Sequence, residues 1–560
     1  MIPTFDIEAL EWVIPIAVGF FDGEEYHEFF KLGDDCDVIR DFLEYLGKNH
    51  QGVKLFAHNA ANYDNKFILS TLTTMGEEVE FLAGMGCIKW VRTGIQFEDS
   101  YLLLGRSLAS CCAAFGVDSK LAWDHNATKN PWEMSNENKL DEFRQYLKRD
   151  CLALSEVLEK FSYLLLENFE VVPSSTLALT AAKAFNKNFY NLRDIHPNEE
   201  VEVFIRKATY GGRNEVYKRY GERVNFYDVR KMYMSCYDVP VPIGKLRWAS
   251  KSMDRGIVAE AWVKIPKGRI GPLPYRYKNR LVFPTGELRG WWDLRELRAA
   301  TKYGVDVHLI RVLDGDEAPI LKEFGDVVGT LIGSSNPDLA RIWKLFGLRL
   351  SGKFGQHKTN TVIRHVKYIA PEEYNPIDPL EVYHEVPCKE VRRKSPYIKP
   401  AINMRIRAEA RIRHLEKMSQ VEDLYYCDTD SIYTTNEMAT GLDIGKLRLV
   451  DFALRAYFIG GKLYGYVNSN GELKQKTAGY RDYPLSEDDF QKLLRGGEIP
   501  CHYRRLGNWK SVLKQGEFLL DEVSFTYRNP STSNRIMGEL ETYPIEVMDK
   551  MSIFTNGASI

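Results

Sequence analysis

The stretch that decides how this chain is interpreted is Leu424-Tyr425-Tyr426-Cys427-Asp428-Thr429-Asp430-Ser431-Ile432-Tyr433. An aromatic, apolar run enters the Asp-Thr-Asp and an apolar run leaves it, which predicts two strands joined by a tight turn with both carboxylates at its tip. Two acids on one turn repel each other unless a cation lies between them, and hard oxygen ligands suit Mg²⁺ or Mn²⁺. A solvated turn explains most isolated Asp-x-Asp pairs, but the flanking aromatics favour a site with a further carboxylate.

Asp228 is the candidate for that further carboxylate. It ends the apolar run Val224-Asn225-Phe226-Tyr227 and opens a second apolar segment. Three acids at two adjacent strand ends could hold two metal ions and perform in-line phosphoryl transfer. The two stretches resemble the carboxylate motifs A and C of family B DNA polymerases, and Tyr-Cys-Asp-Thr-Asp-Ser is a highly specific form of motif C.

Composition sets outer limits on the interpretation. A chain of 560 residues, 44% of them hydrophobic, is long enough for several globular domains. It has no apolar run of about eighteen residues, so we expect no membrane span, and its start lacks the features of a signal peptide. Nine scattered cysteines without a Cys-x-x-Cys pair indicate a reducing compartment such as the cytoplasm, and argue against structural zinc. A net charge of −2 says little, because it can hide a basic groove beside acidic clusters.

Three weak signals in the first third of the chain gain weight from their order. Asp6 and Glu8 lie two apart on one face of an expected strand, Asp64 opens an expected helix, and Tyr146 and Asp150 lie four apart on a long amphipathic segment, residues 138–169. Alone, each has an ordinary structural explanation. Together they resemble the three motifs of proofreading 3′–5′ exonuclease domains. The resemblance implies an RNase H-like domain in which Asp6, Glu8, Asp64 and Asp150 hold two divalent ions. It also implies that Tyr146 orients the attacking water, Lys148 assists the phosphate, and single-stranded DNA is contacted by Asn59, Tyr63, Ser107 and Leu108.

The same resemblance implies roles in the polymerase half. Asp228, Val229 and Asp430 would hold two Mg²⁺ or Mn²⁺ ions, and Asp428 would shape the site. Tyr233 would exclude a 2′-hydroxyl from the incoming nucleotide, with packing in the core as the alternative. Contacts to template or primer DNA are implied for Tyr210, Gly211, Gly212, Lys462 and Tyr464, although the glycines are one place off the usual register and an ordinary loop would look similar.

The nucleotide-binding helix is the weakest match. We expect a helix over residues 338–350 that ends near Ser351-Gly352, with Lys344 facing the triphosphate. A solvated helix face is the alternative for Lys344, and a second cation could be supplied by Arg341 or Arg349. A further basic segment at residues 400–418, with Arg405, Arg407, Arg411 and Arg413, is either a solvated face or a phosphate contact.

These observations predict an α/β and α+β multidomain chain: an exonuclease domain (1–172), a linker helix (173–190), palm segments (191–240 and 399–482), fingers (326–356), a thumb (483–560), and insertions at 241–325 and 357–398. The two insertions resemble those of protein-primed family B polymerases of phages, adenoviruses and linear plasmids. That resemblance implies primer-template DNA, dNTPs and a terminal protein as partners, and the host cytoplasm as the location if the chain is viral. A nuclease with a degenerate, DNA-binding polymerase half and a non-enzymatic replication scaffold are the alternatives.

Overall fold

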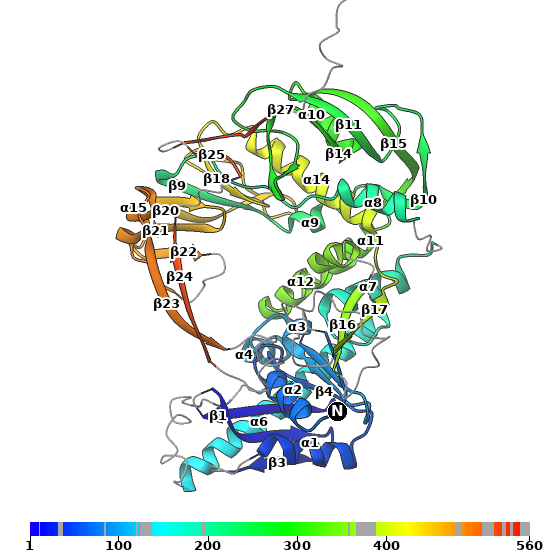
Figure 1. The fold of residues 1–560 in the computed structure, drawn as a ribbon, viewed down its shortest axis with the longest axis vertical. Coiled ribbons are helices and arrows are strands. Elements are labelled where there is room, and N and C mark those ends of the chain that lie inside the picture. Colours follow the sequence, from blue (N-terminus) through cyan, green and yellow to red (C-terminus); the bar gives the residue numbers. More distant parts are fainter. Residues whose placement is uncertain are drawn as a thin grey trace, which may run out of the picture. The chain divides into compact units, whose positions relative to one another are not determined.

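The structure is a computed structural model. It describes residues 1–10, 12–31, 37–82, 86–118, 121, 123, 137–192, 198–356, 359–365, 388–477, 483–506, 520–528, 534–537 and 541–548. The chain divides into two compact units (Figure 1). The first comprises Met1–Phe189, Asp326–Ile398 and Arg504–Val523, and the second comprises Tyr190–Gly325, Lys399–Tyr503 and Ser524–Ile560. No helix in the described ranges is both long and apolar enough to span a membrane.

A nine-stranded mixed sheet forms the centre of the first unit, in the order β17-β16-β5-β6-β7-β4-β1-β2-β3. Its strands are β1 (Thr4–Leu10), β2 (Ile14–Phe21), β3 (Tyr26–Phe30), β4 (Lys54–Ala57), β5 (Val79–Leu82), β6 (Cys87–Trp90), β7 (Gln96–Asp99), β16 (Thr359–His365) and β17 (Cys388–Lys394). In β1, Phe5 and Ile7 are buried while Asp6 and Glu8 are half-buried, which confirms that the two acids share a face. Strand β2 begins at Ile14, after Trp12, whose φ of 69° turns the chain.

The hairpin of β16 and β17 comes from the predicted second insertion. It extends the sheet because β16 pairs antiparallel with β5, from Ile363 opposite Phe81 to His365 opposite Val79. The connection between the two strands, residues 366–387, lies outside the described residues. The insertion therefore adds two strands to the edge of the predicted exonuclease sheet.

The helices of the first unit include α1 (Val38–Asn49), α2 (Asp64–Thr74), α3 (Ser100–Leu104), α4 (Leu108–Phe115), α6 (Glu137–Phe169), α7 (Leu177–Asn188) and α12 (Pro337–Phe354). The expected long segment at 138–169 and the linker helix at 173–190 are thus α6 and α7. Helix α12 does not end near Ser351-Gly352 as expected but continues to Phe354, which is fully buried and meets the Phe185 ring of α7 edge-to-face.

The second unit is built on a seven-stranded sheet in the order β22-β21-β20-β9-β19-β18-β8. Its strands are β8 (Asn214–Val216), β9 (Tyr220–Val229), β18 (Leu424–Asp428), β19 (Ser431–Thr434), β20 (Leu447–Gly460), β21 (Leu463–Asn468) and β22 (Leu473–Thr477). The short helix α9 (Met232–Ser235) follows β9, and the long helix α14 (Pro400–Met418) precedes β18. The two predicted hairpin strands are therefore β18 and β19.

A second, five-stranded sheet is formed by the predicted first insertion, in the order β10-β15-β11-β14-β27. Its strands are β10 (Val241–Ala249), β11 (Val258–Ile265), β14 (Thr285–Asp293), β15 (Asp306–Ala318) and β27 (Glu546–Met548). Strand β27 pairs in parallel with β14. The chain therefore returns to this sheet near its end, within the range predicted as the thumb.

The remaining elements are short or peripheral to the sites described below. They are α8 (Glu199–Lys207), α10 (Leu294–Thr301), α11 (Lys322–Ser334), α15 (Glu487–Leu494), β12 (Tyr275–Tyr277), β13 (Arg280–Val282), β23 (Ile499–Leu506), β24 (Leu520–Tyr527), β25 (Ile536–Met537) and β26 (Thr542–Tyr543).

Candidate active sites

The Asp-Thr-Asp turn of the second unit has a constrained backbone. Thr429 has a φ of 64°, in the left-handed region that few residues other than glycine adopt. Its N–H donates to the carbonyl of Arg213 at 2.6 Å, and the N–H of Asp430 donates to the carbonyl of Asp428 at 2.7 Å. The turn that separates the two carboxylates is therefore held by a neighbouring segment as well as by its own strands.

Asp228 meets this turn as the sequence predicts. It lies opposite Ser431 in the antiparallel pair of β9 and β19, and the N–H of Val229 donates to the carbonyl of Asp430 at 2.8 Å. A pocket of about 430 Å³ opens here, lined among others by Asp228, Asp428 and Asp430. The backbone thus brings three carboxylates from two separate stretches of sequence to one opening.

Two cations lie against these carboxylates. Arg448 of β20 donates to Oδ2 of Asp228 from Nη2 at 2.8 Å, and Nζ of Lys462 lies 2.8 and 2.6 Å from the two oxygens of Asp428. Lys476 is a further cation, 3.9 Å from Asp428. Lys462 was predicted to bind the primer. Arg448 and Lys476 were not predicted, because their contacts depend on strand register rather than on a local motif.

Aromatic side chains pack beside the pocket that contains the three carboxylates. The Tyr433 and Tyr464 hydroxyls lie 3.1 Å apart, and the Tyr426 hydroxyl accepts a hydrogen bond from the N–H of Lys462 at 2.9 Å. All three rings are buried within one aromatic cluster. The aromatic residues that flank the Asp-Thr-Asp turn in the sequence therefore pack against one another beneath it, and Tyr464 belongs to the same cluster.

The Tyr210-Gly211-Gly212 segment lies next to the same turn. A Cβ on Gly212 would lie 2.7 Å from Cγ2 and Oγ1 of Thr429, so only glycine allows this approach. The Tyr210 ring is 3% exposed and packs in the core of the insertion sheet, and burial raises its pKa. The segment thus buttresses the carboxylate turn from within the protein.

Tyr233 is half-buried on α9, five residues after Asp228. Burial raises its pKa, the nearby Arg407 opposes this shift, and the charge of Asp430 adds to it. These interactions place the ring within electrostatic reach of Asp430 and identify Arg407 of α14 as a neighbouring cation, while the role of Tyr233 at the nucleotide sugar stays a prediction.

The other arginines of α14 correct the sequence interpretation, which offered a solvated face or a phosphate contact. Arg405 is fully buried and pairs with Asp293 at 2.5 Å and with Glu317, and Arg411 pairs with Glu296 at 2.7 Å. Arg413 pairs with Asp238 and Glu409 at 2.8 and 2.9 Å. Arg405 and Arg411 are neither solvated nor open to phosphate, because acids distant in the sequence neutralise them within the fold, whereas Arg413 is half-exposed.

In the first unit, the carboxylates of the predicted exonuclease site converge at the N-terminus of α2, which begins at Asp64. Asp64 is 2% exposed, and its Oδ1 accepts a hydrogen bond from the N–H of Ile7, which lies between Asp6 and Glu8 on β1. Burial, together with the charges of Glu8 and Asp99, raises the pKa of Asp64 to about 7. A cation beside Asp64 would stabilise the charged form of this carboxylate.

Helix α6 brings the third motif to this place. Tyr146 is 2% and Asp150 is 5% exposed, and burial followed by the charges of Glu8, Asp6 and Asp150 raises the pKa of Tyr146. Lys148 is exposed, with Nζ 5.5 Å from the centre of the Tyr26 ring. The predicted carboxylates and tyrosine therefore form one cluster with a cation on its outer side.

Asp99 is a carboxylate that the sequence analysis missed. It is 1% exposed at the end of β7, where it accepts hydrogen bonds from the N–H groups of Tyr101 at 2.8 Å and Ala61 at 3.1 Å. The latter bond holds the turn that carries Asn59, whose φ is 66°. The signal available in the sequence was weak, since an Asp just before a helix is an ordinary N-cap.

Three further predicted DNA contacts have different surroundings in the structure. Ser107 caps α4 by accepting a hydrogen bond from the N–H of Ser110 at 3.3 Å, and Leu108 is buried behind it. Tyr63 forms an edge-to-face pair with Phe67 at 5.3 Å, and burial followed by the charges of Asp64, Glu8 and Asp6 raises its pKa. Tyr63 therefore belongs to the carboxylate cluster, whereas Ser107 belongs to a helix start.

On α12 the candidate nucleotide-binding cations differ in their surroundings. Arg341 pairs with Asp338 at 2.9 Å, and Arg349 donates to the carbonyl of Leu102 at 3.1 Å, where burial lowers its pKa. Lys344 is half-exposed and forms no ion pair with any residue that the structure describes. A contact of Lys344 with the triphosphate stays a prediction.

Both carboxylate clusters fit divalent metal ions by their donor chemistry. Asp228, Asp430 and the carbonyl of Val229 offer only oxygen donors, as do the four acids of the first unit, and Mg²⁺ and Mn²⁺ prefer such donors. A buried carboxylate with a raised pKa, as at Asp64, is stabilised in its charged form by a neighbouring cation.

Comparison with solved structures identifies the class to which this fold belongs. Phi29 DNA polymerase, solved with primer-template DNA and incoming nucleotides, shares the fold with a TM-score of 0.69 at 16% identity, over 94% of this chain and 99% of that one. The fold is thus an RNase H-like exonuclease domain followed by a palm-fingers-thumb polymerase.

Sequence comparison narrows this class to a family. The family model of type B DNA polymerases, organellar and viral, matches residues 48–139 and 117–375, and this chain belongs to that family. A DNA-directed DNA polymerase of Enterobacteria phage PRD1 is 24% identical over 94% of this chain and 93% of its own length. A probable DNA polymerase of Ascobolus immersus is 25% identical over 66% of this chain, which spans about 36% of that relative's length.

Proposed function

We propose that this protein is a DNA-directed DNA polymerase that also degrades DNA from its 3′ end. The observation that carries the proposal is the pairing of β9 with β19, which brings Asp228 and Asp430 to one pocket through the 2.8 Å bond from the N–H of Val229. Family membership and the fold shared with phi29 DNA polymerase support the same reaction.

In the proposed reaction, a primer 3′-hydroxyl attacks the α-phosphate of a dNTP and pyrophosphate leaves. Asp228, Val229 and Asp430 would hold two Mg²⁺ or Mn²⁺ ions, which supply charge neutralisation at the reacting phosphate and activate the attacking oxygen. Lys462 fixes the Asp428 carboxylate, and Tyr464 supports it through the aromatic cluster. Lys344 would contact the triphosphate.

The proofreading reaction is proposed for the first unit. Asp6, Glu8, Asp64 and Asp150 would hold the two metal ions, Tyr146 would orient the attacking water, and the exposed Lys148 would contact the phosphate. The raised pKa of Asp64 supports this assignment, because perturbed carboxylates of this kind concentrate at functional sites.

One gel tests both activities. An end-labelled primer on a longer template is incubated with Mg²⁺, with and without dNTPs, and should lengthen with dNTPs and shorten without them. Asp430→Asn should abolish lengthening and keep shortening, while Glu8→Gln should do the reverse. A nuclease with a degenerate polymerase half would shorten the primer in both lanes and be indifferent to Asp430→Asn. A scaffold without enzymatic activity would change neither lane.

Protein priming is proposed on the strength of the two insertions, the five-stranded sheet and the β16–β17 hairpin. A terminal protein would then offer a side-chain hydroxyl as the first primer. Transfer of a labelled deoxynucleotide to a co-purified partner protein would support this mode. Its absence under conditions in which a DNA primer is extended would exclude it without affecting the polymerase proposal.

A further inference from the structure

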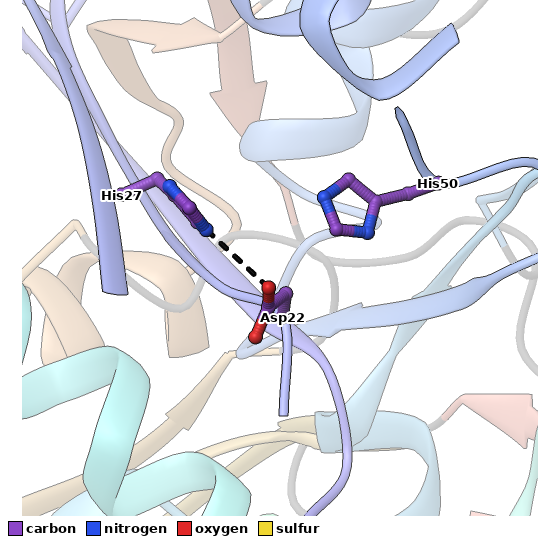
Figure 2. A group of neighbouring side chains, drawn as sticks. All are labelled: Asp22, His27 and His50. Atoms are coloured by element: carbon purple, nitrogen blue, oxygen red, sulfur yellow. Dashed lines mark hydrogen bonds and ion pairs between the residues drawn. The ribbon is translucent and has the colours of Figure 1, made fainter. Parts of the chain in front are cut away.

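A cluster of potential metal ligands lies in the first unit apart from the four acids of the predicted exonuclease site. Asp22 lies in the turn between β2 and β3, His27 lies on β3, and His50 follows the end of α1. One ligand atom from each lies within 4.8 Å of the others (Figure 2). Figure 2 shows the His27 ring directed at the Asp22 carboxylate, with the His50 ring on the other side of that carboxylate.

The carboxylate of Asp22 is oriented before any ligand arrives. Its Oδ1 accepts hydrogen bonds from the N–H groups of Glu24 and Glu25, both at 2.7 Å, which leaves Oδ2 facing Nε2 of His27 at 3.3 Å. The backbone of the turn therefore fixes this carboxylate with Oδ2 directed at the His27 ring.

The two imidazoles are also held in place. The His27 ring stacks on Phe20 at 5.7 Å, and the His50 ring meets Phe20 edge-on at 5.2 Å. Tyr45 of α1 lies 5.2 Å from His27 and 5.4 Å from His50, between ring centres. Fixed ring orientation is a property of imidazoles that bind metal ions.

A hydrogen bond between His27 and Asp22 does not account for His50. Its Nε2 is buried and has no hydrogen-bond partner among the residues that the structure describes. A buried polar atom without a partner is costly and uncommon, so it calls for a specific explanation. A cation shared by His50, His27 and Asp22 would supply one.

We propose that Asp22, His27 and His50 bind a divalent cation of the borderline class, Zn²⁺ first, with water in the fourth position. Two imidazoles and one carboxylate are a recurrent protein ligand set for Zn²⁺ and a poor one for Mg²⁺. Bond lengths of about 2.0–2.2 Å place tetrahedral ligand atoms roughly 3.4 Å apart. The 3.3 Å separation of His27 and Asp22 already meets this spacing, and the ligand atom of His50 lies within 4.8 Å of both, so metal binding requires His50 to move closer.

The proposed role is structural. Strand β3 is an edge strand of the nine-stranded sheet, and the cation would tie that edge and its preceding turn to the end of α1. The cysteine spacing argued against structural zinc, but a site of two histidines and an aspartate requires no cysteine. The proposal is independent of the polymerase and exonuclease reactions, because its ligands belong to neither carboxylate cluster.

The test is a Co²⁺ titration of the full-length chain after removal of bound metals with a chelator. Excess Mg²⁺ is present to occupy the all-oxygen clusters. One equivalent of Co²⁺ should give the intense visible absorption of tetrahedral coordination, Zn²⁺ should displace it, and Zn²⁺ should raise the melting temperature. His50→Gln and Asp22→Asn should each weaken binding at least about tenfold. The exposed His308, on β15 of the other unit, provides the matched control His308→Gln, which should bind as the wild type does.

Asp22→Asn keeps the test decisive if a histidine variant fails to fold. An amide oxygen can still accept the hydrogen bonds from Glu24 and Glu25, so the turn is retained while the anionic ligand is lost. Its metal-free melting temperature should match that of the wild type. Equal Co²⁺ spectra for the wild type and Asp22→Asn, or only the weak absorption of six-coordinate Co²⁺, would overturn the proposal.

Discussion

The Asp-Thr-Asp turn is predicted to depend on the absence of a side chain at Gly212. In Gly212→Ala, the new Cβ would lie 2.7 Å from two atoms of Thr429, whereas ordinary contacts begin at 3.4 Å. Thr429 must therefore retreat by about 0.7 Å, which is that difference, and it carries Asp428 and Asp430 on either side. Since misplacement of reacting groups by about 1 Å can cost about 100-fold in rate, we expect primer extension to fall about 10- to 100-fold.

Gly211→Ala is the matched control for this change. A Cβ at Gly211 would lie 3.6 Å from Leu281, an ordinary contact, and neither glycine requires a positive φ. The assay is single-turnover primer extension, with primer shortening as an internal check on the first unit. Shortening should be unchanged in both variants, and extension should be nearly unchanged in Gly211→Ala.

A second-site change distinguishes a steric clash from any other effect of the alanine. Thr429→Gly removes every side-chain atom that the new Cβ would meet, and glycine accepts the φ of 64° at this position. The double variant should therefore recover the activity of Thr429→Gly alone. Equal losses in Gly211→Ala and Gly212→Ala, or no recovery in the double variant, would refute the reasoning.

Three further outcomes follow from buried charges. Arg411→Met should lower the free energy of unfolding by about 3–5 kcal/mol in urea titrations, because it leaves Glu296 buried without its partner. The control, Arg407→Met on the half-exposed side of the same helix, should lower this free energy far less. Burial lowers the pKa of His414 to about 4, whereas its ordinary pKa in the unfolded chain is 6.5. Between these values the unfolded chain binds a proton at His414 and the folded chain does not. The free energy of unfolding should therefore fall as the pH drops from 6.5 towards 4, and fall less steeply in His414→Gln. Because the pKa of Asp64 is raised to about 7, metal binding at pH 6.5 should release a proton from this carboxyl. In titration calorimetry, the heat of metal binding should therefore depend on the ionisation enthalpy of the buffer in the wild type, but not in Asp64→Asn.

Local motifs predicted the carboxylates well because each motif is short and its geometry is set by one strand or one helix turn. Asp6 and Glu8 share a face as alternation requires, and Asp228 meets Asp430 because Asp228 lies near the end of β9 and Asp430 lies in the turn just before the adjacent β19. The resemblance to a known family then placed these local pieces in one fold. What the motifs could not give was the surroundings of each carboxylate.

Those surroundings depend on contacts between residues far apart in the chain. Arg448 binds Asp228 across 220 residues of sequence, and Arg411 binds Glu296 across 115. A basic run on a helix is usually solvated, and nothing local distinguishes an arginine whose acid partner lies in an insertion. The same limit hid the approach of His50 to Asp22, since both are ordinary surface residues by local pattern.

The contacts of Arg411 change how the Tyr210-Gly211-Gly212 segment should be understood. Nη1 of Arg411 donates to the carbonyls of Tyr210 and Gly211 at 2.9 and 3.1 Å. The carbonyl of Arg213 in turn accepts the N–H of Thr429. Hydrogen bonds thus hold the segment to α14 at Tyr210 and Gly211, and the next residue after the segment, Arg213, is bonded to the carboxylate turn. A DNA contact at this segment would act on a support of the metal-binding turn, so variants that displace the segment, as Gly212→Ala does, would change catalysis even where DNA affinity is unaltered.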